Sequence, residues 1–248
     1  MIRPFLSVII PTYNEVEQIA LTLIELDLYL AAQEFSYELL VIDNDSSDAT
    51  ADIVKKFVPV IKNLKIINNP DNRGVSSAVK IGNLTAKGNW RLVLTSKSLV
   101  PISQFADFLP MLSAGHAADV LIAVRSILGA KIDPPLPIFR RLADYCLNKF
   151  VRRLLKSKVT DFLLDFQCFS ESASEKILPA IKLTGSGYLL ETLALAEFLG
   201  LAIKEVPVKA AYIPNVTSSA FNYLQMFWET LKIRWWIKRG SYHLESEI

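Results

Sequence analysis

Predominantly apolar segments of strand length recur four times in the first hundred residues: 5–10, 37–42, 64–67 and 91–94. Between them lie segments whose apolar residues recur every three or four positions, which is the period of an amphipathic helix. These segments are 15–32, 46–57 and 76–87. Strands without polar alternation are buried on both faces. The pattern therefore predicts an α/β fold with a mostly parallel central sheet flanked by helices.

Two of the predicted helices begin at polar residues typical of helix starts. Asn14, followed three residues later by Glu17, has the spacing of an N-cap and its reciprocal partner. Ser46 or Ser47 stands at the start of the second helix. We therefore expect side-chain caps at both positions.

The second half of the chain is less regular. It contains further apolar strands at 120–125 and 201–208 and an apolar helix at 189–200 that ends at Gly200. Residues 139–155 form a strongly basic helix, and residues 221–240 an aromatic and basic amphipathic helix. Without repeats or a Pro- or Gly-rich linker, we predict one domain over 1–213 and a C-terminal amphipathic helix within 214–248.

Polar segments follow the predicted strands, where a parallel sheet presents its carboxyl ends. They are PTYNE (11–15), DNDSSD (43–48), NNPDNRG (68–74) and TSKS (95–98). Ligands of open α/β sheets bind in the crevice at this edge. We expect the four segments to meet there.

Composition narrows the class of protein without deciding it. The chain is 51% hydrophobic and 21% charged with a net charge of +2, which is typical of a globular protein. Its mean hydropathy of +0.30 indicates a membrane-facing surface, yet no apolar run approaches the roughly 18 residues needed to span a bilayer. The N-terminal apolar stretch is too short for a signal peptide, so we expect a cytoplasmic protein.

Several other function classes lack their motifs. No Gly-rich turn follows the first strand, as a Rossmann dehydrogenase would require, and no GxxxxGK[ST] is present. A nucleic-acid reader motif is also missing, so nucleic acid is not an expected partner.

The segments SVIIPTYNE, VIDNDSSDAT and NRGVSSAVKIGNLTAKGNW, in this order, resemble family 2 glycosyltransferases of the GT-A fold. The similarity covers roughly residues 5–213 and is greatest to the branch that transfers sugars to polyprenyl phosphates, the dolichyl-phosphate mannose and glucose synthases. It implies a nucleotide diphosphate sugar as donor, with UDP preferred over GDP, and a lipid phosphate as acceptor.

The resemblance also implies which residues bind the nucleotide sugar: Pro11, Tyr13, Glu15, Asp43, Asp45, Arg73 and Ser96. Asp43 would accept hydrogen bonds from the base or ribose. Asp45 occupies a position where the family usually has Gly, and Gly74 is expected to adopt a positive φ. For Asp48, stabilising the next helix start is at least as good an interpretation as a ligand contact.

On the acceptor side, the resemblance points to Arg125, Arg140 and Arg141 as phosphate-binding residues. An ordinary solvated helix face is the alternative for the two that lie on the basic helix. Asp161 and Glu191 are candidate catalytic residues. A lone Glu on an apolar helix is costly to bury unless it is paired, which favours a functional role for Glu191 over a peripheral salt bridge.

The fourth strand departs from the family. Relatives end it in Asp-x-Asp, which binds Mg²⁺ or Mn²⁺ against the diphosphate, whereas this chain has Thr95, Ser96, Lys97 and Ser98. Hydroxyls and an ammonium are poor ligands for a hard cation, so no metal residue is assigned. Three interpretations are open: Lys97 replaces the metal as a catalytic group, the protein binds without catalysis, or Asp165 or another distant acid holds the ion.

If the chain is active, the expected reaction is an inverting displacement at the anomeric carbon. A phosphate acceptor is already anionic and needs no general base. The aromatic and basic residues of 221–239 favour contact with the cytoplasmic face of a membrane, with packing on the domain or on a second subunit as the alternative. A non-catalytic nucleotide-binding or regulatory relative is the rival function.

Overall fold

Seven strands form the central sheet of the computed structural model, which describes residues 3–113, 118–125, 127–211 and 220–242. The strand order is β3-β2-β1-β4-β7-β5-β8. The strands are β1 Leu6–Thr12, β2 Tyr37–Asp43, β3 Leu64–Asn68, β4 Trp90–Val93, β5 Val120–Val124, β7 Gln167–Ser170 and β8 Ile203–Pro207. All neighbours pair in parallel except β7, which runs antiparallel between β4 and β5. The predicted mostly parallel sheet is confirmed.

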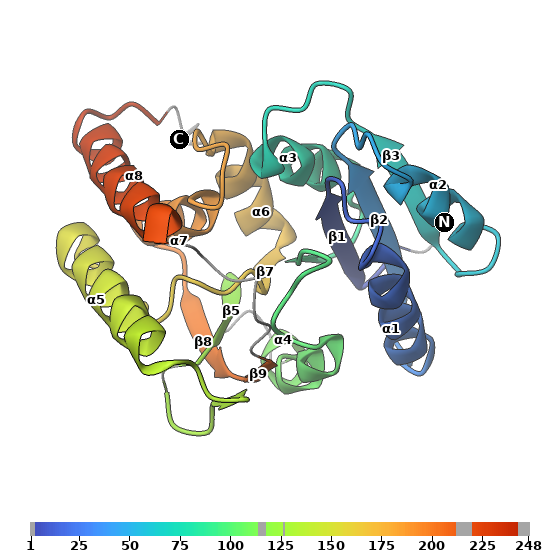
Figure 1. The fold of residues 1–248 in the computed structure, drawn as a ribbon, viewed down its shortest axis with the longest axis horizontal. Coiled ribbons are helices and arrows are strands. Elements are labelled where there is room, and N and C mark those ends of the chain that lie inside the picture. Colours follow the sequence, from blue (N-terminus) through green and yellow to red (C-terminus); the bar gives the residue numbers. More distant parts are fainter. Residues whose placement is uncertain (1–2, 114–117, 126, 212–219, 243–248) are drawn as a thin grey trace.

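Helices cover both faces of this sheet (Figure 1). They are α1 Ile19–Ala31, α2 Thr50–Phe57, α3 Val75–Thr85, α4 Leu109–Ser113, α5 Ile138–Leu155, α6 Glu171–Ile177, α7 Tyr188–Phe198 and α8 Ala220–Lys238. Successive residues of β1 enter opposite cores, because side chains alternate along a strand. Val8 and Ile10 pack in the core that contains α1 residues, and Ile9 packs in the core that contains α3 and α7 residues.

The helix starts differ from the predicted caps. α1 begins at Ile19 after Gln18, which makes no side-chain cap. Asn14 instead has a positive φ of 51°, and its side-chain oxygen accepts a hydrogen bond from the Ser47 N–H. The Asn14 cap was therefore wrong, because the side chain is used to join two loops rather than to begin a helix.

The second helix also begins later than predicted. α2 starts at Thr50, and Asp48 accepts hydrogen bonds from both the Thr50 N–H (2.9 Å) and its hydroxyl. The start at Ser46 or Ser47 was wrong. The helix-start role of Asp48, given as one alternative from the sequence, is what the described contacts support.

Three short strands were not predicted. β7 enters the sheet from the far half of the chain and pairs Cys168 with both Leu92 and Leu121. β6 Lys131–Asp133 and β9 Lys209–Ala211 form a separate two-stranded sheet. Strands of three or four residues carry too little periodicity to be recognised in sequence.

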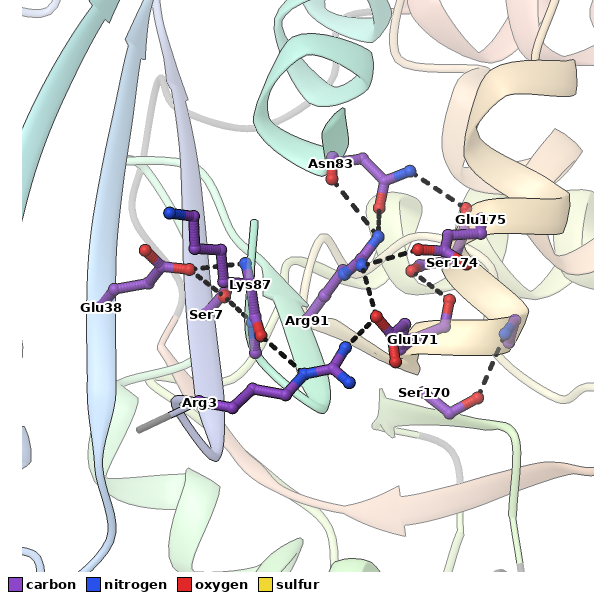
Figure 2. A network of polar contacts seen from close by, with 12 residues as sticks. Arg3, Ser7, Glu38, Asn83, Lys87, Arg91, Ser170, Glu171, Ser174 and Glu175 are labelled. Carbon is purple, nitrogen blue, oxygen red and sulfur yellow. Dashed lines mark hydrogen bonds and ion pairs between the residues drawn. The ribbon is translucent and has the colours of Figure 1, made fainter. Parts of the chain in front are cut away.

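A polar network ties the sheet together at the amino ends of its strands (Figure 2). The buried Arg91 guanidinium on β4 contacts the Asn83 side chain at 2.6 Å, Glu175 at 3.1 Å and Glu171 at 3.5 Å. The buried Glu38 on β2 accepts hydrogen bonds from Ser7 and from the Lys87 N–H, both at 2.7 Å. This end of the sheet is held by charge pairs within the protein.

The C-terminal helix α8 packs on α5 and α7 through one face, on which Met226 and Ile233 are buried. The boundary predicted between 213 and 214 lies outside the described residues. Within the described part of the chain, no helix has the length and apolar character needed to cross a bilayer.

Candidate active site

The polar tip after β4 lies in a cavity of about 320 Å³ at the carboxyl edge of the sheet. Thr95 and Lys97 line this cavity together with Glu15 from the loop after β1. Asp165, which precedes β7, lies on the same wall. The structure therefore brings the predicted Glu15 and Lys97 together and adds the acid at the position where relatives have Gly.

Two carboxylates hold the four tip residues. Asp165 accepts hydrogen bonds from the Thr95 N–H at 3.2 Å, from the Thr95 hydroxyl and from the Ser98 hydroxyl at 3.0 Å. Glu15 accepts a hydrogen bond from the Ser96 hydroxyl, and its other oxygen lies 3.7 Å from the Lys97 ammonium. The tip is thus fixed by acids that belong to other segments of the chain.

The electrostatics of Glu15 follow from its position. Its side chain is almost buried, and this burial raises its pKa above the ordinary value. The Ser96 hydrogen bond and the Lys97 charge oppose the shift, whereas the Asp165 charge adds to it. Lys97 is the less buried partner, with 39% of its side chain exposed.

These groups do not suit a divalent cation. Three donors already occupy the oxygens of Asp165, and an ammonium lies against Glu15, whereas Mg²⁺ requires free oxygen ligands in octahedral geometry. Nowhere in the described ranges do three or more Asp, Glu, His or Cys side chains gather in a way that could hold a metal ion. The side chains at this tip therefore do not fit the metal that the family resemblance implies.

Arg125 lines the same cavity from the end of β5, in a buried ion pair with Asp161. Its Nε and one terminal nitrogen lie 2.8 and 3.0 Å from the two oxygens of Asp161, a two-point contact. Burial disfavours the charged forms of Arg125 and Asp161, but their mutual attraction and hydrogen bonds outweigh this effect. The pKa of Arg125 is therefore raised and that of Asp161 is lowered.

Asp144 completes this cluster from α5. Its carboxylate lies 3.4 Å from Arg125 and accepts a hydrogen bond from the Tyr223 hydroxyl on α8. Arg125 and Asp144 also line a second cavity of about 710 Å³, together with Arg141. The neighbouring Arg140 lines the smaller cavity with Lys97. The three predicted phosphate-binding arginines therefore surround two adjoining cavities.

Five of the predicted nucleotide-binding residues lie at the carboxyl ends of β1 and β2, and the other two, Arg73 and Ser96, follow β3 and β4. Asp43 is buried; one of its oxygens accepts a hydrogen bond from the Ser46 N–H at 3.2 Å, and the other has no partner among the described residues. Asp45 has a positive φ of 62°, which explains why Gly suits this turn and why Asp is tolerated in it. Gly74 has the expected positive φ, at 88°.

The remaining three predicted residues are placed differently from one another. Pro11 is buried within β1, whereas half of Tyr13 is exposed in the loop that follows. Arg73 extends into solvent, where it pairs with Asp71 at 2.8 Å. Of these three residues, Pro11 is buried, whereas Tyr13 and Arg73 have exposed side chains.

The profile of the family described as "Glycosyl transferase family 2" matches residues 7–178, which include the whole β1–β4 edge and Asp165. The chain belongs to this family. It is 24% identical to the dolichyl-phosphate beta-glucosyltransferase of Dictyostelium discoideum, over 98% of this chain and 77% of the relative. It is also 24% identical to the human protein of that name, over 97% of this chain and 78% of the relative.

Solved structures show the same GT-A fold. Glucosyl-3-phosphoglycerate synthase from Mycobacterium tuberculosis, in complex with UDP, superposes with a TM-score of 0.68 at 17% identity, over 93% of this chain and 80% of that one. Mannosyl-3-phosphoglycerate synthase from Rubrobacter xylanophilus gives 0.69 at 14% identity, over 98% and 77%. The predicted fold class is confirmed.

In this family 2 glycosyltransferase, Glu191 does not line the cavity that holds Lys97. It is fully buried on α7, where its oxygens accept hydrogen bonds from the Lys182 and Leu183 N–H groups at 2.9 and 2.8 Å and from the Tyr242 hydroxyl at 2.6 Å. These contacts supply the pairing that burial requires. They fasten the chain around 182–183 to α7, and an acceptor-side role for Glu191 stays a prediction.

The sequence did not identify Asp144 or Tyr188 as site residues. Asp144 is the one acid between Arg140 and Lys158, and this isolation was the available signal. Tyr188 lines the cavity at the start of α7, where its buried hydroxyl has no partner among the described residues and burial raises its pKa. Nothing in the apolar segment around Tyr188 indicates this position.

Proposed function

We propose that this protein transfers a glucosyl or related hexosyl group from a UDP-sugar to a polyprenyl phosphate, with inversion at the anomeric carbon and without a divalent metal. Support for the acceptor comes from the dolichyl-phosphate beta-glucosyltransferases that match nearly the whole chain. Support for a UDP donor comes from the UDP complex of a structural neighbour.

One observation carries the metal-free part of the proposal. Lys97 stands at the position where the family's metal acids are found, in a cavity that it shares with Arg125 and Arg140. Of these, Arg125 is neutralised by two carboxylates, whereas among the described residues Lys97 has one ion-pair contact, at 3.7 Å, and its side chain is partly exposed. An ammonium in this position can offset the charge that develops on the departing diphosphate.

The proposed reaction is a single displacement. A phosphate oxygen of the acceptor attacks the anomeric carbon and forms the new C–O bond, while the bond from that carbon to the UDP oxygen breaks and UDP leaves with the electron pair. The acceptor oxygen is already anionic, so no proton has to be removed. Lys97 faces the leaving diphosphate, and Arg140 and Arg141 face the acceptor phosphate.

Other residues act by binding or positioning. The unpartnered oxygen of Asp43 is suited to accept a hydrogen bond from the base or ribose. Glu15 and Asp165 hold the tip that carries Lys97, and Asp161 fixes the guanidinium plane of Arg125. In this proposal Asp161 is a positioning residue, since its two oxygens are occupied by Arg125.

Calorimetric titration with UDP and UDP-glucose, in Mn²⁺ and again in EDTA, tests the donor half. We expect UDP binding of similar affinity in both buffers, and its loss in Asp43→Ala. Binding that requires Mn²⁺ would overturn the metal-free site. GDP and GDP-mannose are the matched comparison for the choice of base.

A non-catalytic nucleotide-binding protein is the second candidate, favoured by the missing metal acids. Both functions predict UDP binding, so only turnover separates them. We expect UDP release from UDP-glucose to rise when a polyprenyl phosphate in detergent is added, compared with the same detergent alone. Binding without any acceptor-dependent release would favour the non-catalytic candidate.

A further inference from the structure

The outer face of α5 divides into an apolar half and a basic half along the helix axis. Its exposed apolar side chains all lie in the first eight residues: Ile138, Phe139, Leu142 and Tyr145. Its exposed cations from residue 149 onward are Lys149, Arg152 and Arg153, followed by Lys156 at the C-cap. At 3.6 residues per turn, these positions share one side of the helix, opposite the buried Leu147 and Val151.

Helix α8 lies beside α5 and runs in the same direction (Figure 1). The Phe150 and Phe227 rings stack with centroids 4.2 Å apart, and nearer the amino-terminal ends of both helices Tyr223 contacts Asp144. The exposed side of α8 carries large apolar and aromatic residues: Leu224, Phe227, Trp228 and Trp235. Exposed Lys232, Lys238 and Arg239 lie among them.

Every acid on these two helices is buried. α5 contains only Asp144, which is turned inward to Arg125, and α8 contains only Glu229, which is buried beside Gln225. All exposed charges on both helices are therefore positive, although the whole chain has a net charge of only +2. A surface with this charge selects an anionic partner.

We propose that the joint outer face of α5 and α8 docks on the surface of an anionic lipid bilayer, with the amino-terminal end of α5 seated deepest. Exposed aliphatic and aromatic side chains interleaved with lysines and arginines are the composition of an interfacial helix. A nucleic acid would engage the cations but would leave Ile138, Leu142 and Leu224 against water. A bilayer accommodates both sets of side chains.

The docked orientation places the site next to the lipid. Phe139, which is 86% exposed, directly precedes Arg140 and Arg141, which line the two adjoining cavities. A phosphate at the headgroup level would then meet these arginines without leaving the membrane surface. This consequence for the acceptor rests on the proposed function, whereas docking itself does not.

Co-sedimentation of the full chain with vesicles tests the docking. Phosphatidylcholine vesicles are compared with vesicles in which phosphatidylglycerol replaces part of that lipid, and neither contains a polyprenyl phosphate. We expect partitioning to the anionic vesicles only, weakened about tenfold by Phe139→Ser, as the loss of one buried aromatic side chain predicts. Neutralisation by R152Q and R153Q should weaken it about fivefold for each charge.

Matched controls sit on a different face. Leu28 on α1 is 70% exposed, and Lys55 and Lys56 are basic residues of α2, so Leu28→Ser and K55Q/K56Q likewise remove an exposed apolar side chain and two positive charges, away from α5 and α8. We expect both controls to bind as the unaltered protein does. Trp228 and Trp235 on this face supply a second readout, because vesicles with brominated acyl chains should quench part of the tryptophan fluorescence of the protein.

The docking surface would be overturned by no binding to anionic vesicles, by equal loss in the α1 and α2 controls, or by a dimer in solution that Phe139→Ser dissociates. Binding to a short DNA duplex as strong as that to the vesicles would also overturn it. The acceptor-dependent UDP release is measured in detergent without a bilayer, so failure of docking and failure of the proposed transfer are separately visible.

Discussion

The two ends of β4 carry cations that differ in burial and in pairing. At the amino end, the Arg91 guanidinium is buried and surrounded by Asn83, Glu171 and Glu175 (Figure 2). Four residues later the strand passes into the tip that carries Lys97, whose ammonium is partly exposed and only 3.7 Å from one carboxylate. The same strand thus carries a cation paired on several sides and a cation that faces a cavity.

The difference separates stabilising charges from charges that can act on a ligand. A buried charge must be paired, and removal of its partner lowers the free energy of unfolding. The network at the amino end of β4 therefore stabilises the fold. A partly solvated ammonium with one long contact can exchange that contact for a diphosphate at small cost. The carboxyl edge contains both kinds, because Arg125 is paired as fully as Arg91.

The largest effect is expected where a buried pair is broken beside the cavity. Asp161→Ala removes the two-point partner of Arg125 and leaves a guanidinium with 7% side-chain exposure against Asp144 alone. Loss of one partner of a buried pair costs about 3–5 kcal/mol of unfolding free energy. Urea unfolding measures it, and a loss below about 1 kcal/mol would contradict the assignment of this pair as structural.

At the amino end, Arg91→Met is expected to cost less. Its acidic partners Glu171 and Glu175 are partly exposed and can be hydrated once the guanidinium is gone. We expect a loss of about 1–3 kcal/mol from the hydrogen bonds that Asn83 and the carboxylates make to it. UDP affinity of the folded protein should not change, and a parallel fall in affinity would remove the distinction between the two ends.

Lys97→Met is the matched change at the carboxyl end. The exposed position predicts a stability change within about 0.5 kcal/mol. If Lys97 faces the diphosphate as proposed, loss of its charge should weaken UDP binding by about tenfold or more, equivalent to roughly 1.4 kcal/mol. Calorimetry in EDTA measures the affinity, and the reverse outcome, with stability lost and affinity kept, would make Lys97 a structural residue.

The smallest effects concern pH. Burial tends to raise the pKa of Glu38, but hydrogen bonds from the Lys87 N–H, Ser7 and Lys65 outweigh it and hold the pKa below 4.5. The folded state therefore gains stability from the charged form above 4.5 and loses it as the pH falls through the lowered pKa. We expect Glu38→Gln to be less stable at neutral pH, with the difference vanishing in acid.

Glu15 should behave in the opposite sense. Its pKa is raised by burial, so its charged form costs stability that is recovered as the pH falls through the folded pKa. Glu15→Gln is then expected to be at least as stable as the unaltered protein at neutral pH, with any advantage lost in acid. Unfolding curves of Glu38→Gln and Glu15→Gln, measured from acid to neutral pH, give the free energy of unfolding of each variant. If both variants were less stable than the unaltered protein at neutral pH by similar amounts, the opposite behaviour expected of Glu38 and Glu15 would be contradicted.

Local pattern was sufficient for the elements with many periodic residues. The buried strands β1, β2 and β5 and the helices α5, α7 and α8 lie where the sequence predicts them, because burial on both faces or on one stripe imposes a period along the chain. The crevice was also predictable, since the carboxyl ends of parallel strands meet at one edge. The roles of Asn14 and Ser46 could not be predicted, because these side chains make contacts between loops instead of capping helices.

Which charges meet was decided by the tertiary structure. Asp165 reaches the β4 tip because β7 inserts antiparallel beside β4, a pairing between residues more than 70 positions apart that no local period encodes. The burial of Glu191 and the pairing of Arg125 with Asp144 likewise depend on how helices turn in the packed molecule. So does the outer face of α5 and α8, on which every exposed charge is positive. The sequence determined the edge at which chemistry is possible, and packing determined which side chains are free to carry it out there.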